Sequence, residues 1–527
     1  MKKQGLAYLI ILAMVISIFP MVLVSAAAGD SANDPILIGT AAELATLAAR
    51  VNGNTEPAGL YYKLTADIDL DASPYNTGVG WTPIGSITNR EFRGHFDGNN
   101  KKITGLFINK TTADGGLFSR IYDGSVKNLG LEGVNVTGTT RNGGLAAYIN
   151  NSNVENCYVT GTVTSTGDYT GGLVANLEKS TAKNCYTSVT VAGGTNIGGL
   201  VGTSRGNSNI ENCYTTGTVT STSLYIGGLV GYVRDNSTIK NCYSTGTITG
   251  VSEAGGIAGY LDNSANSITN CYTTGMISTS GNYAAGIVGR FVHTDSVISN
   301  CYSVAAVSGA NYVGGIAGGF PNGKVISCAA LNPSVKGTGS NVARVSGYDN
   351  SRSTGNVAFS GMLNNDELPT WGWVGLNNRS GEDRSAAELQ LASGFPAVFS
   401  AAPWTYTPGY LPSLSSTIPV AMPEHLTIIT KTAELEALLS EFDSAVMTDE
   451  NGKITLTVPY TEGIRLYVAT YTNGSFHTLS GLEIPIPNGN TYKFDMPATD
   501  NYKIMLLADN LKPVIKPVTY ETIWNIA

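Results

Sequence analysis

Short apolar runs alternate with polar turns along most of this chain. Residues 227–233 read GGLVGYV, residues 234–237 form a polar turn, and residues 238–243 read TIKNCY. The runs are rich in β-branched residues and are bounded by Gly, Asn and Ser, so each such unit predicts two or three short strands. The one helix that we expect covers residues 41–51, where Thr40 and Glu43 have the spacing of a capping box.

The same pattern returns with a nearly constant period. Asn-Cys-Tyr occurs six times and then closes in the degraded form Ser327-Cys328, and successive cysteines are 27 to 30 residues apart. The phrase Gly-Gly-Leu/Ile-Val/Ala-Gly keeps step with it. Self-similarity of this kind is typical of stacked repeats, and it predicts one coil of a β-solenoid per repeat.

The residue before each Asn indicates that the coils stack in parallel and in register. Glu155, Lys183, Glu211 and Lys240 alternate in sign from one coil to the next. In a solenoid these side chains lie one above another, so opposite charges become neighbours, whereas like charges in register would repel. Each exposed pair contributes little energy. The alternation is therefore evidence of register more than of stability.

Each residue of the tripeptide is expected to form a column along the solenoid. Asparagine tolerates a left-handed turn and can hydrogen-bond its own copies above and below. We expect that column to contain Asn156, Asn184, Asn212, Asn241, Asn270 and Asn300. The cysteines should point inward as small hydrophobic residues, because stacked positions about 4.8 Å apart fit disulfide geometry poorly. They are Cys157, Cys185, Cys213, Cys242, Cys271, Cys301 and Cys328, the last in the degraded repeat.

The tyrosine column is the best candidate for a ligand-binding surface. Its rings should point outward, and tyrosine offers a large, rigid contact with a polar tip. Shielding of the sheet face is the alternative role. The column contains Tyr158, Tyr186, Tyr214, Tyr243, Tyr272 and Tyr302.

The repeats resemble the GLUG motif, which is found in bacterial surface and adhesin-like proteins and near some IgA-protease-type peptidases. Residues 61–64, 67–70, 81–85 and 92–99 resemble the lead-in that precedes such repeats. The resemblance extends over about residues 35–345. It implies an all-β fold, a right-handed parallel β-helix displayed at the cell surface, and it implies no activity.

The two ends of the chain differ from the repeats. Residues 1–28 combine a basic start, an apolar run and small residues, which is the pattern of a secretory signal peptide. An uncleaved membrane anchor is the alternative. We then expect an N-terminal cap with the first coils at 29–110, GLUG-like coils at 111–345, a closing coil and linker at 346–422, and a small β-sandwich-like domain at 423–527.

Composition and motifs offer little catalytic chemistry. Only 13% of residues are charged and the net charge is −8, which argues against nucleic-acid binding. Residues 202–206 match G-x-S-x-G, but they fall at a turn of the repeat and not at a strand-to-helix turn. Arg93, His95 and Asp97 share one face of an expected strand and are candidates for an acid/base group, with a solvated strand face as the alternative. We expect no metal and no cofactor.

These observations favour a secreted, surface-associated rod with an adhesin-like role and no enzymatic activity. Its expected partners are glycans or host and cell-surface proteins, and the sequence leaves the oligomeric state open. A polysaccharide lyase or hydrolase on the same scaffold is the second reading. A passive structural spacer is the third.

Overall fold

The computed structural model describes most of the chain from residue 28 onward. It describes residues 28–427 apart from 86–88, 111–113, 263, 321, 350–351, 366–368 and 415–418, together with the backbone of the strands between 448 and 519. The expected signal peptide lies outside the described residues. No helix in the described part is long and apolar enough to cross a membrane.

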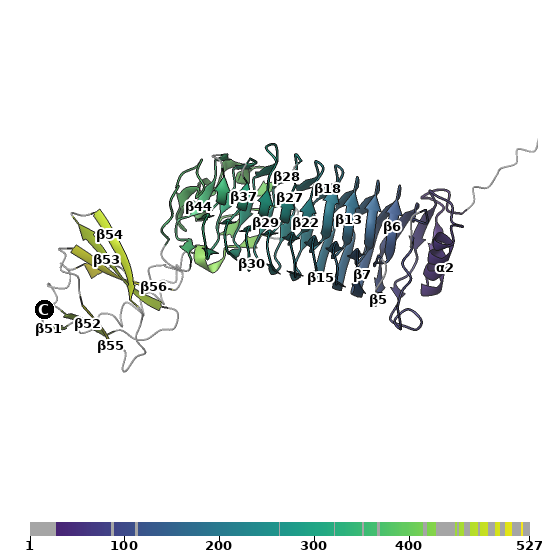
Figure 1. Cartoon of the computed structure of the whole chain (residues 1–527), viewed down its shortest axis with the longest axis horizontal. Helices are drawn as coiled ribbons and strands as arrows, with labels where there is room; N and C mark the ends of the chain where they lie inside the picture. The colour runs from purple at the N-terminus through teal and green to yellow at the C-terminus, as the bar shows by residue number, and fades with distance from the viewer. Residues whose placement is uncertain are drawn as a thin grey trace, which may run out of the picture.

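The rod begins with a helical cap. β1 (Ile36–Ile38) leads into α2 (Ala41–Asn52), and β2 (Tyr61–Leu64) follows. The capping box is present, since the Glu43 N–H donates to Thr40 Oγ1 at 3.2 Å and the Thr40 N–H donates to Glu43 Oε2 at 3.0 Å. The apolar side of α2 is buried, which covers the open edge of the first coil (Figure 1).

One coil of the solenoid consists of four short strands. In a central coil they are β14 (Thr181–Lys183), β15 (Tyr186–Gly193), β16 (Ile197–Gly198) and β17 (Val201–Arg205). Each pairs in parallel with its equivalents in the next coil. The strands therefore merge into parallel sheets of 29, eight and nine strands. The predicted all-β parallel solenoid with one coil per repeat is confirmed, with four strands in this coil where we expected two or three.

The register agrees with the alternating charges. Glu155 pairs with Lys183, Lys183 with Glu211, and Glu211 with Lys240. Each coil thus sits directly above its predecessor, and a residue type that recurs in the sequence becomes a column in space.

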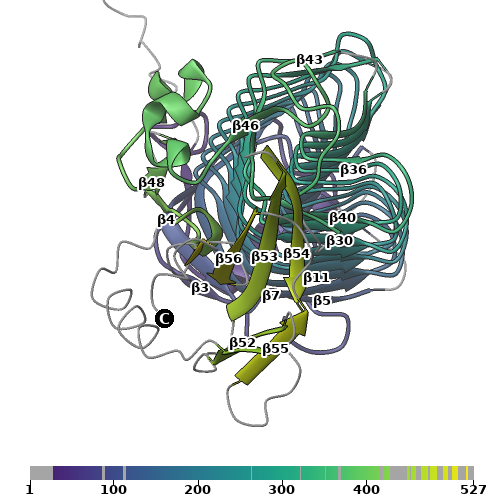
Figure 2. The same cartoon turned by 90° about the vertical axis from the view of Figure 1, so that its left-hand side faces the viewer.

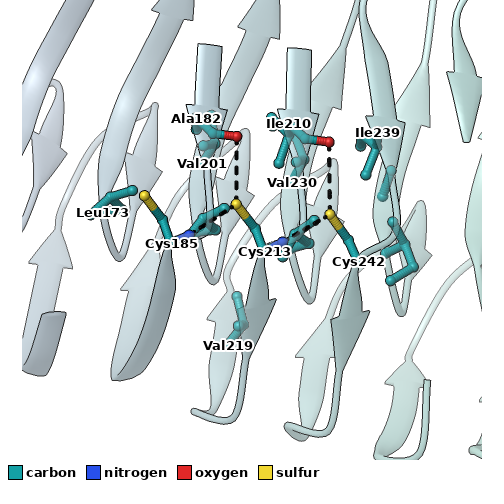
Figure 3. Close-up of a cluster of buried hydrophobic side chains, with 14 of the residues drawn as sticks. Leu173, Ala182, Cys185, Val201, Ile210, Cys213, Val219, Val230, Ile239 and Cys242 are labelled. Carbon is teal, nitrogen blue, oxygen red and sulfur yellow. Dashed lines mark hydrogen bonds between the residues drawn. The ribbon is translucent and has the colours of Figure 1, made fainter. Parts of the chain in front are cut away.

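The core is built by repetition of the same inward positions. Ile210 and Cys213 of one coil stack on Ile239 and Cys242 of the next, and all four are almost completely buried (Figure 3). One continuous cluster of buried residues extends from the helical cap to the last coil. The close in-register packing of equal side chains leaves the rod with a single apolar axis.

The third glycine of the Gly-Gly-Leu-Val-Gly phrase marks an inner corner of the coil. A Cβ atom on Gly231 would lie 2.5 Å from the backbone N of Ile197 and 2.6 Å from the carbonyl carbon of Asn196. The outward side of β22 (Val230–Val233) is therefore in contact with the backbone that leads into β16. Two strand faces meet here at a re-entrant angle, which brings side chains from both of them together.

The end of the solenoid is covered by its own chain. The last coils use β42 (Ser346–Asp349) and end with β46 (Glu382–Arg384). Residues 385–414 and 419–427, which the sequence predicts to be largely linker, pack against the outside of the coils and are called here the strap. His425 Nε2 lies 2.8 Å from the carbonyl oxygen of Leu331. Figure 2 shows β48 (Tyr410–Leu411) and the short helices of this strap beside the stack.

Beyond the strap, the described strands form two antiparallel sheets, one of three strands and one of four. These strands fall within residues 423–527, where we expect a small β-sandwich-like domain. The first sheet contains β51 (Thr448–Glu450), β52 (Lys453–Thr457) and β55 (Thr491–Asp495). The second contains β53 (Ile464–Thr472), β54 (Ser475–Leu482), β56 (Asn501–Ala508) and β57 (Val518–Thr519).

Candidate functional site

The six tyrosines that follow the cysteines form one regular stack, called here the tyrosine ladder. Neighbouring rings are 4.7 to 5.0 Å apart between centroids, and their planes differ by 1 to 7°. The spacing equals the rise from coil to coil. The members are Tyr158, Tyr186, Tyr214, Tyr243, Tyr272 and Tyr302.

Only part of the ladder faces solvent. The first four rings are half-buried, whereas Tyr272 and Tyr302 are buried. The strap covers them, because Trp404 lies 6.2 and 5.6 Å from their ring centroids and Phe399 lies 6.0 Å from that of Tyr302. The sequence placed all six rings outside. The covering segment is about one hundred residues away in the chain, so nothing in the repeat could reveal it.

The stack hides the part of each ring that a sugar would need. Carbohydrates pack against aromatic faces, but here each face is covered by the next ring, so that edges and hydroxyl groups are what remain outside. The open end is covered too, since a Cβ atom on Gly130 would lie 2.4 Å from Tyr158 Cζ. The Tyr158 hydroxyl donates to Glu132 Oε1 at 2.8 Å. This geometry suits a structural ladder better than a sugar-binding surface.

The asparagines beside the ladder form a chain of hydrogen bonds. Each side-chain amide donates to the Oδ1 atom of the asparagine one coil earlier, at 2.9 to 3.2 Å. The chain starts at Asn128, which donates to Asp97 Oδ1 at 3.1 Å. The residues have φ of 53 to 56°, the left-handed turn expected for this position. The members are Asn128, Asn156, Asn184, Asn212, Asn241, Asn270 and Asn300.

The cysteines face the core and are all unpaired thiols. Their sulfur atoms line up along the rod, and the backbone N–H of Cys213 lies 3.4 Å from Cys242 Sγ (Figure 3). Burial raises the pKa of the Cys213 and Cys242 thiols, because a thiolate would lose its hydration there. All seven cysteines are almost completely buried, so they pack as small apolar side chains.

A second aromatic surface lies at the inner corner. Tyr232 of β22 and Tyr260 of β27 (Ala258–Leu261) are stacked neighbours with centroids 5.5 Å apart. Tyr225, which precedes β21 (Ile226–Gly227), comes within 5.4 and 4.9 Å of them. The rings thus come from two different strand faces. We call this surface, extended by the residues described next, the elbow cluster.

The next coils continue the cluster with a cation between aromatic rings. Arg290 occupies the position of the next coil that pairs with Tyr260. Its Cζ atom lies 5.6 Å from the centre of the Tyr260 ring and 4.8 Å from that of the Tyr283 ring. Tyr283 stacks on Tyr312 with centroids 4.6 Å apart. Such arginine–aromatic contacts are favourable by about 0.5–2 kcal/mol, and they hold the guanidinium group in place.

Glu253 occupies the position equivalent to Tyr225 and Tyr283, in the coil between them. It is 6% exposed, and its Oε1 atom is 3.4 Å from Arg290 Nη1. Burial raises the pKa of this carboxyl group, while the guanidinium group opposes the rise. Its Oε2 atom accepts no hydrogen bond from the described residues. The elbow cluster therefore combines half-buried rings, a fixed cation and a carboxylate acceptor within a few coils.

Sequence reasoning missed this cluster although a signal exists. Tyr225, Tyr283 and Tyr312 each stand two residues before the Gly-Gly phrase or its Ala-Gly variant, as does Tyr169. All four have positive φ of 60 to 64°, which is unusual for a bulky residue. The residue type at these positions varies from coil to coil, since Glu253 and Arg290 interrupt the tyrosines. Because of that variation the tyrosines do not stand out from the other turn residues in the sequence.

The residues proposed for an acid/base group do not act together. Arg93 Nη1 donates to Asp123 Oδ2 at 2.8 Å, and His95 Nδ1 lies 3.0 Å from Ser125 Oγ. Asp97 instead accepts from the Asn128 amide. Each of the three is held by its own neighbour one coil away, which favours the solvated strand face.

The G-x-S-x-G match is likewise structural. Ser204 is completely buried within strand β17, and not at a strand-to-helix turn. A nucleophile needs an exposed position that a substrate can reach. This serine has no such position.

Comparison with known proteins identifies the repeats. A model of the GLUG motif matches residues 138–164, 193–220 and 222–249, which confirms the resemblance read from the sequence. A "Putative Gly-rich membrane protein" of Evansella cellulosilytica is 44% identical over 102 residues, or 19% of this chain and 11% of the relative. "Halomucin" of Haloquadratum walsbyi is 34% identical over 104 residues, or 19% of this chain and 1% of the relative.

The chain thus corresponds to only a small part of these relatives. Among solved structures, a putative immunoglobulin A1 protease from Bacteroides ovatus has a TM-score of 0.40 at 23% identity, over 48% of this chain and 79% of that one. A second structure, "IgA1 Protease", has a TM-score of 0.35 at 21% identity, over 53% of this chain and 22% of that one. Similarity at this level carries no conclusion about activity.

Proposed function

We propose that this protein is an extracellular, surface-associated binding rod with an adhesin-like role, and that the elbow cluster contacts glycans. The observation that carries the proposal is the meeting of half-buried tyrosines, Arg290 and the Glu253 carboxylate at one inner corner over successive coils. The rings of the elbow cluster are stacked, so their edges and hydroxyl groups, together with the Arg290 guanidinium group, offer donors and acceptors to the hydroxyl groups of a sugar, while the buried Glu253 carboxylate holds Arg290 in place. The GLUG motif and the relative named as a membrane protein support the surface location.

A binding role suits the architecture better than catalysis. The elbow cluster is an open surface along a rod, and such a surface can follow a linear chain of sugars from coil to coil. Removal of a contact then reduces affinity in proportion to its share of the interface. A lyase or hydrolase would instead need two positioned acid/base groups at one bond, and Arg93, His95 and Asp97 do not supply them.

The test uses the full chain and a panel of immobilised glycans. We expect saturable binding to at least one glycan class without cleavage of it. Tyr260→Ala and Arg290→Ala should each reduce the affinity, by about tenfold if one good aromatic or charge-assisted contact of about 1.4 kcal/mol is lost. The matched control is Tyr186→Ala, which removes a half-buried tyrosine from the ladder and should leave binding unchanged.

The outcomes separate the alternatives. Loss of binding in Tyr186→Ala with none in Tyr260→Ala would assign the ligand to the ladder and reject the elbow cluster. New oligosaccharides in the supernatant would identify an enzyme. Binding of a host or cell-surface protein but no glycan would keep the adhesin-like role and change the partner. Circular dichroism of each variant confirms that the solenoid is intact.

A further inference from the structure

A cavity in the N-terminal cap is separate from both aromatic surfaces. It opens to solvent, and the space between its walls, open solvent included, is about 410 Å³. It lies between the end of α2, the loop that follows, and the segment that precedes β4 (His95–Thr104). Its walls include Val51, Asn54, Glu56, Tyr62, Glu91 and Phe92.

One of the two carboxylates in the cavity, Glu56, already has a close cation and a hydrogen-bond donor. The Glu56 side chain is 5% exposed, and its Oε2 atom is 2.5 Å from Arg50 Nε. Its Oε1 atom accepts a hydrogen bond from the Tyr62 hydroxyl group. Burial and this carboxylate together raise the pKa of Tyr62, so the phenol stays protonated and remains the donor.

Glu91 has one oxygen atom without a donor. Its Oε1 atom accepts from the Asn89 N–H at 2.9 Å. Its Oε2 atom is buried and receives no hydrogen bond from the described residues, and the side chain as a whole is only 5% exposed. A buried acceptor without a donor costs about 1–3 kcal/mol, and more when it is charged, so a ligand that supplies the donor gains that energy.

The nearest cation, Arg93, does not donate a hydrogen bond to Glu91 Oε2. Arg93 Nη2 is 3.6 Å from Glu91 Oε2, beyond hydrogen-bond distance. The same guanidinium group donates to Asp123 at 2.8 Å and lies 5.3 Å from the ring centre of Tyr122. Neither Asp123 nor Tyr122 lines the cavity, so Arg93, which does line it, is held by partners outside it and does not donate to the Glu91 oxygen atom.

The chemistry of the walls selects the ligand. The inner carboxylates disfavour anions, and the apolar parts of Val51, Tyr62 and Phe92 favour a short hydrocarbon stem. A primary ammonium group carries three donors and one positive charge, and charge-assisted bonds to a carboxylate are among the strongest. We propose that this cavity binds a primary alkylammonium group, such as the end of a lysine side chain or a free amine, with Glu91 as its acceptor. This inference does not depend on the glycan proposal.

The test measures thermal stability of the full chain with three probes of equal size, which are butylammonium chloride, butanol and sodium butyrate, each at matched ionic strength. A ligand that binds the folded state raises the melting temperature of the cap in a concentration-dependent way. We expect this rise with butylammonium only. Glu91→Gln should abolish it, because the amide keeps the Asn89 contact but removes the charge.

The matched control is Asp123→Asn, which removes the other carboxylate on Arg93 from outside the cavity. It should keep the response to butylammonium. Nuclear magnetic resonance of the unmodified protein provides a readout that does not depend on a variant folding, and shifts should be confined to residues around the cavity. A response to butanol equal to that of butylammonium, or one that survives in Glu91→Gln, would overturn the proposal.

A second comparison identifies the source of the ammonium group. Nα-acetyl-lysine amide presents the side chain as a protein would, whereas butylammonium represents a free amine. Tighter binding of the lysine derivative supports a partner protein, and tighter binding of butylammonium supports a small amine. Absence of saturable binding by both rejects the site. Glycan binding by the elbow cluster is measured separately, so either proposal can fail alone.

Discussion

The tyrosine ladder and the elbow cluster use the same residue for different ends. In the ladder one position is tyrosine in six successive coils, and each ring is covered by the next. In the elbow cluster the equivalent positions change from coil to coil among tyrosine, glutamate and arginine. In a uniform column each side chain packs against its own copy in the next coil. In a varied column the neighbouring side chains differ in chemistry, and a ligand can distinguish them. On a solenoid, the departures from the repeat are therefore the better guide to a binding site.

The neighbours of the two surfaces point the same way. The ladder runs beside the hydrogen-bonded asparagines and the buried thiols, so three adjacent columns serve the stacking of coils. The elbow cluster lies at a re-entrant corner where Gly231 lets two strand faces meet. The columns beside the tyrosine ladder add the same stabilising contacts with each coil. The elbow cluster instead brings different side chains together at one corner.

The largest effect is expected at the corner itself. Gly231→Ala places a Cβ atom against backbone atoms of the preceding coil, which cannot move aside as a side chain could. We expect a loss of about 3 kcal/mol in the free energy of unfolding, the upper end for overpacking. The control is Gly372→Ala, where the added Cβ atom meets nothing within 4 Å. Urea denaturation of both variants checks this. Equal stability of the two would contradict the close backbone contact at Gly231.

The next effect tests the role of the asparagine column. Asn241→Ala removes the amide bonds to Asn212 and Asn270 and forces alanine into a left-handed conformation with φ of 55°. We expect a loss of about 2 kcal/mol. Asn241→Gly restores the backbone freedom but not the bonds, so about half of that loss should return. If Gly and Ala cost the same, the left-handed turn is not what the column provides.

A smaller effect should appear in alkaline solution. Burial and the bond to Glu132 raise the pKa of Tyr158 to about 12, and burial raises the pKa of Tyr243 to about 12. An unfolded tyrosine titrates near 10, so the contribution to stability is present below pH 10 and is lost as the pH rises through 12. Tyrosinate absorbance measures the midpoints. Glu132→Gln should lower the Tyr158 midpoint and leave that of Tyr243 in place.

The smallest effect concerns register. Lys183→Glu places three glutamates in one column, because Lys183 pairs with Glu155 on one side and Glu211 on the other. We expect a loss of about 0.5 kcal/mol that disappears in high salt. Melting temperatures at low and high ionic strength check this, with Thr269→Glu as the control near one end of the alternating column. A loss that salt does not reverse would point to packing instead of charge.

Several features were predictable because they are local or periodic. The spacing of Thr40 and Glu43 sufficed for the helix cap, and the return of Asn-Cys-Tyr sufficed for the coils and their register. A period in the sequence becomes a translation in space once equivalent strands pair. For that reason the inward thiols and the bonded asparagines follow from the sequence alone.

The features that depend on tertiary contacts do not recur at a fixed interval along the sequence. The strap brings Trp404 onto Tyr302, the corner brings Tyr225 onto Tyr260, and the cap leaves one oxygen atom of Glu91 without a donor from the described residues. Each depends on contacts between segments that share no repeating pattern, and a chain can close such contacts in many ways until the whole fold excludes all but one. The repeats in the sequence suffice for the rod, since in-register stacking follows from them, whereas the exposure of each face depends on how the non-repeating segments fold against it.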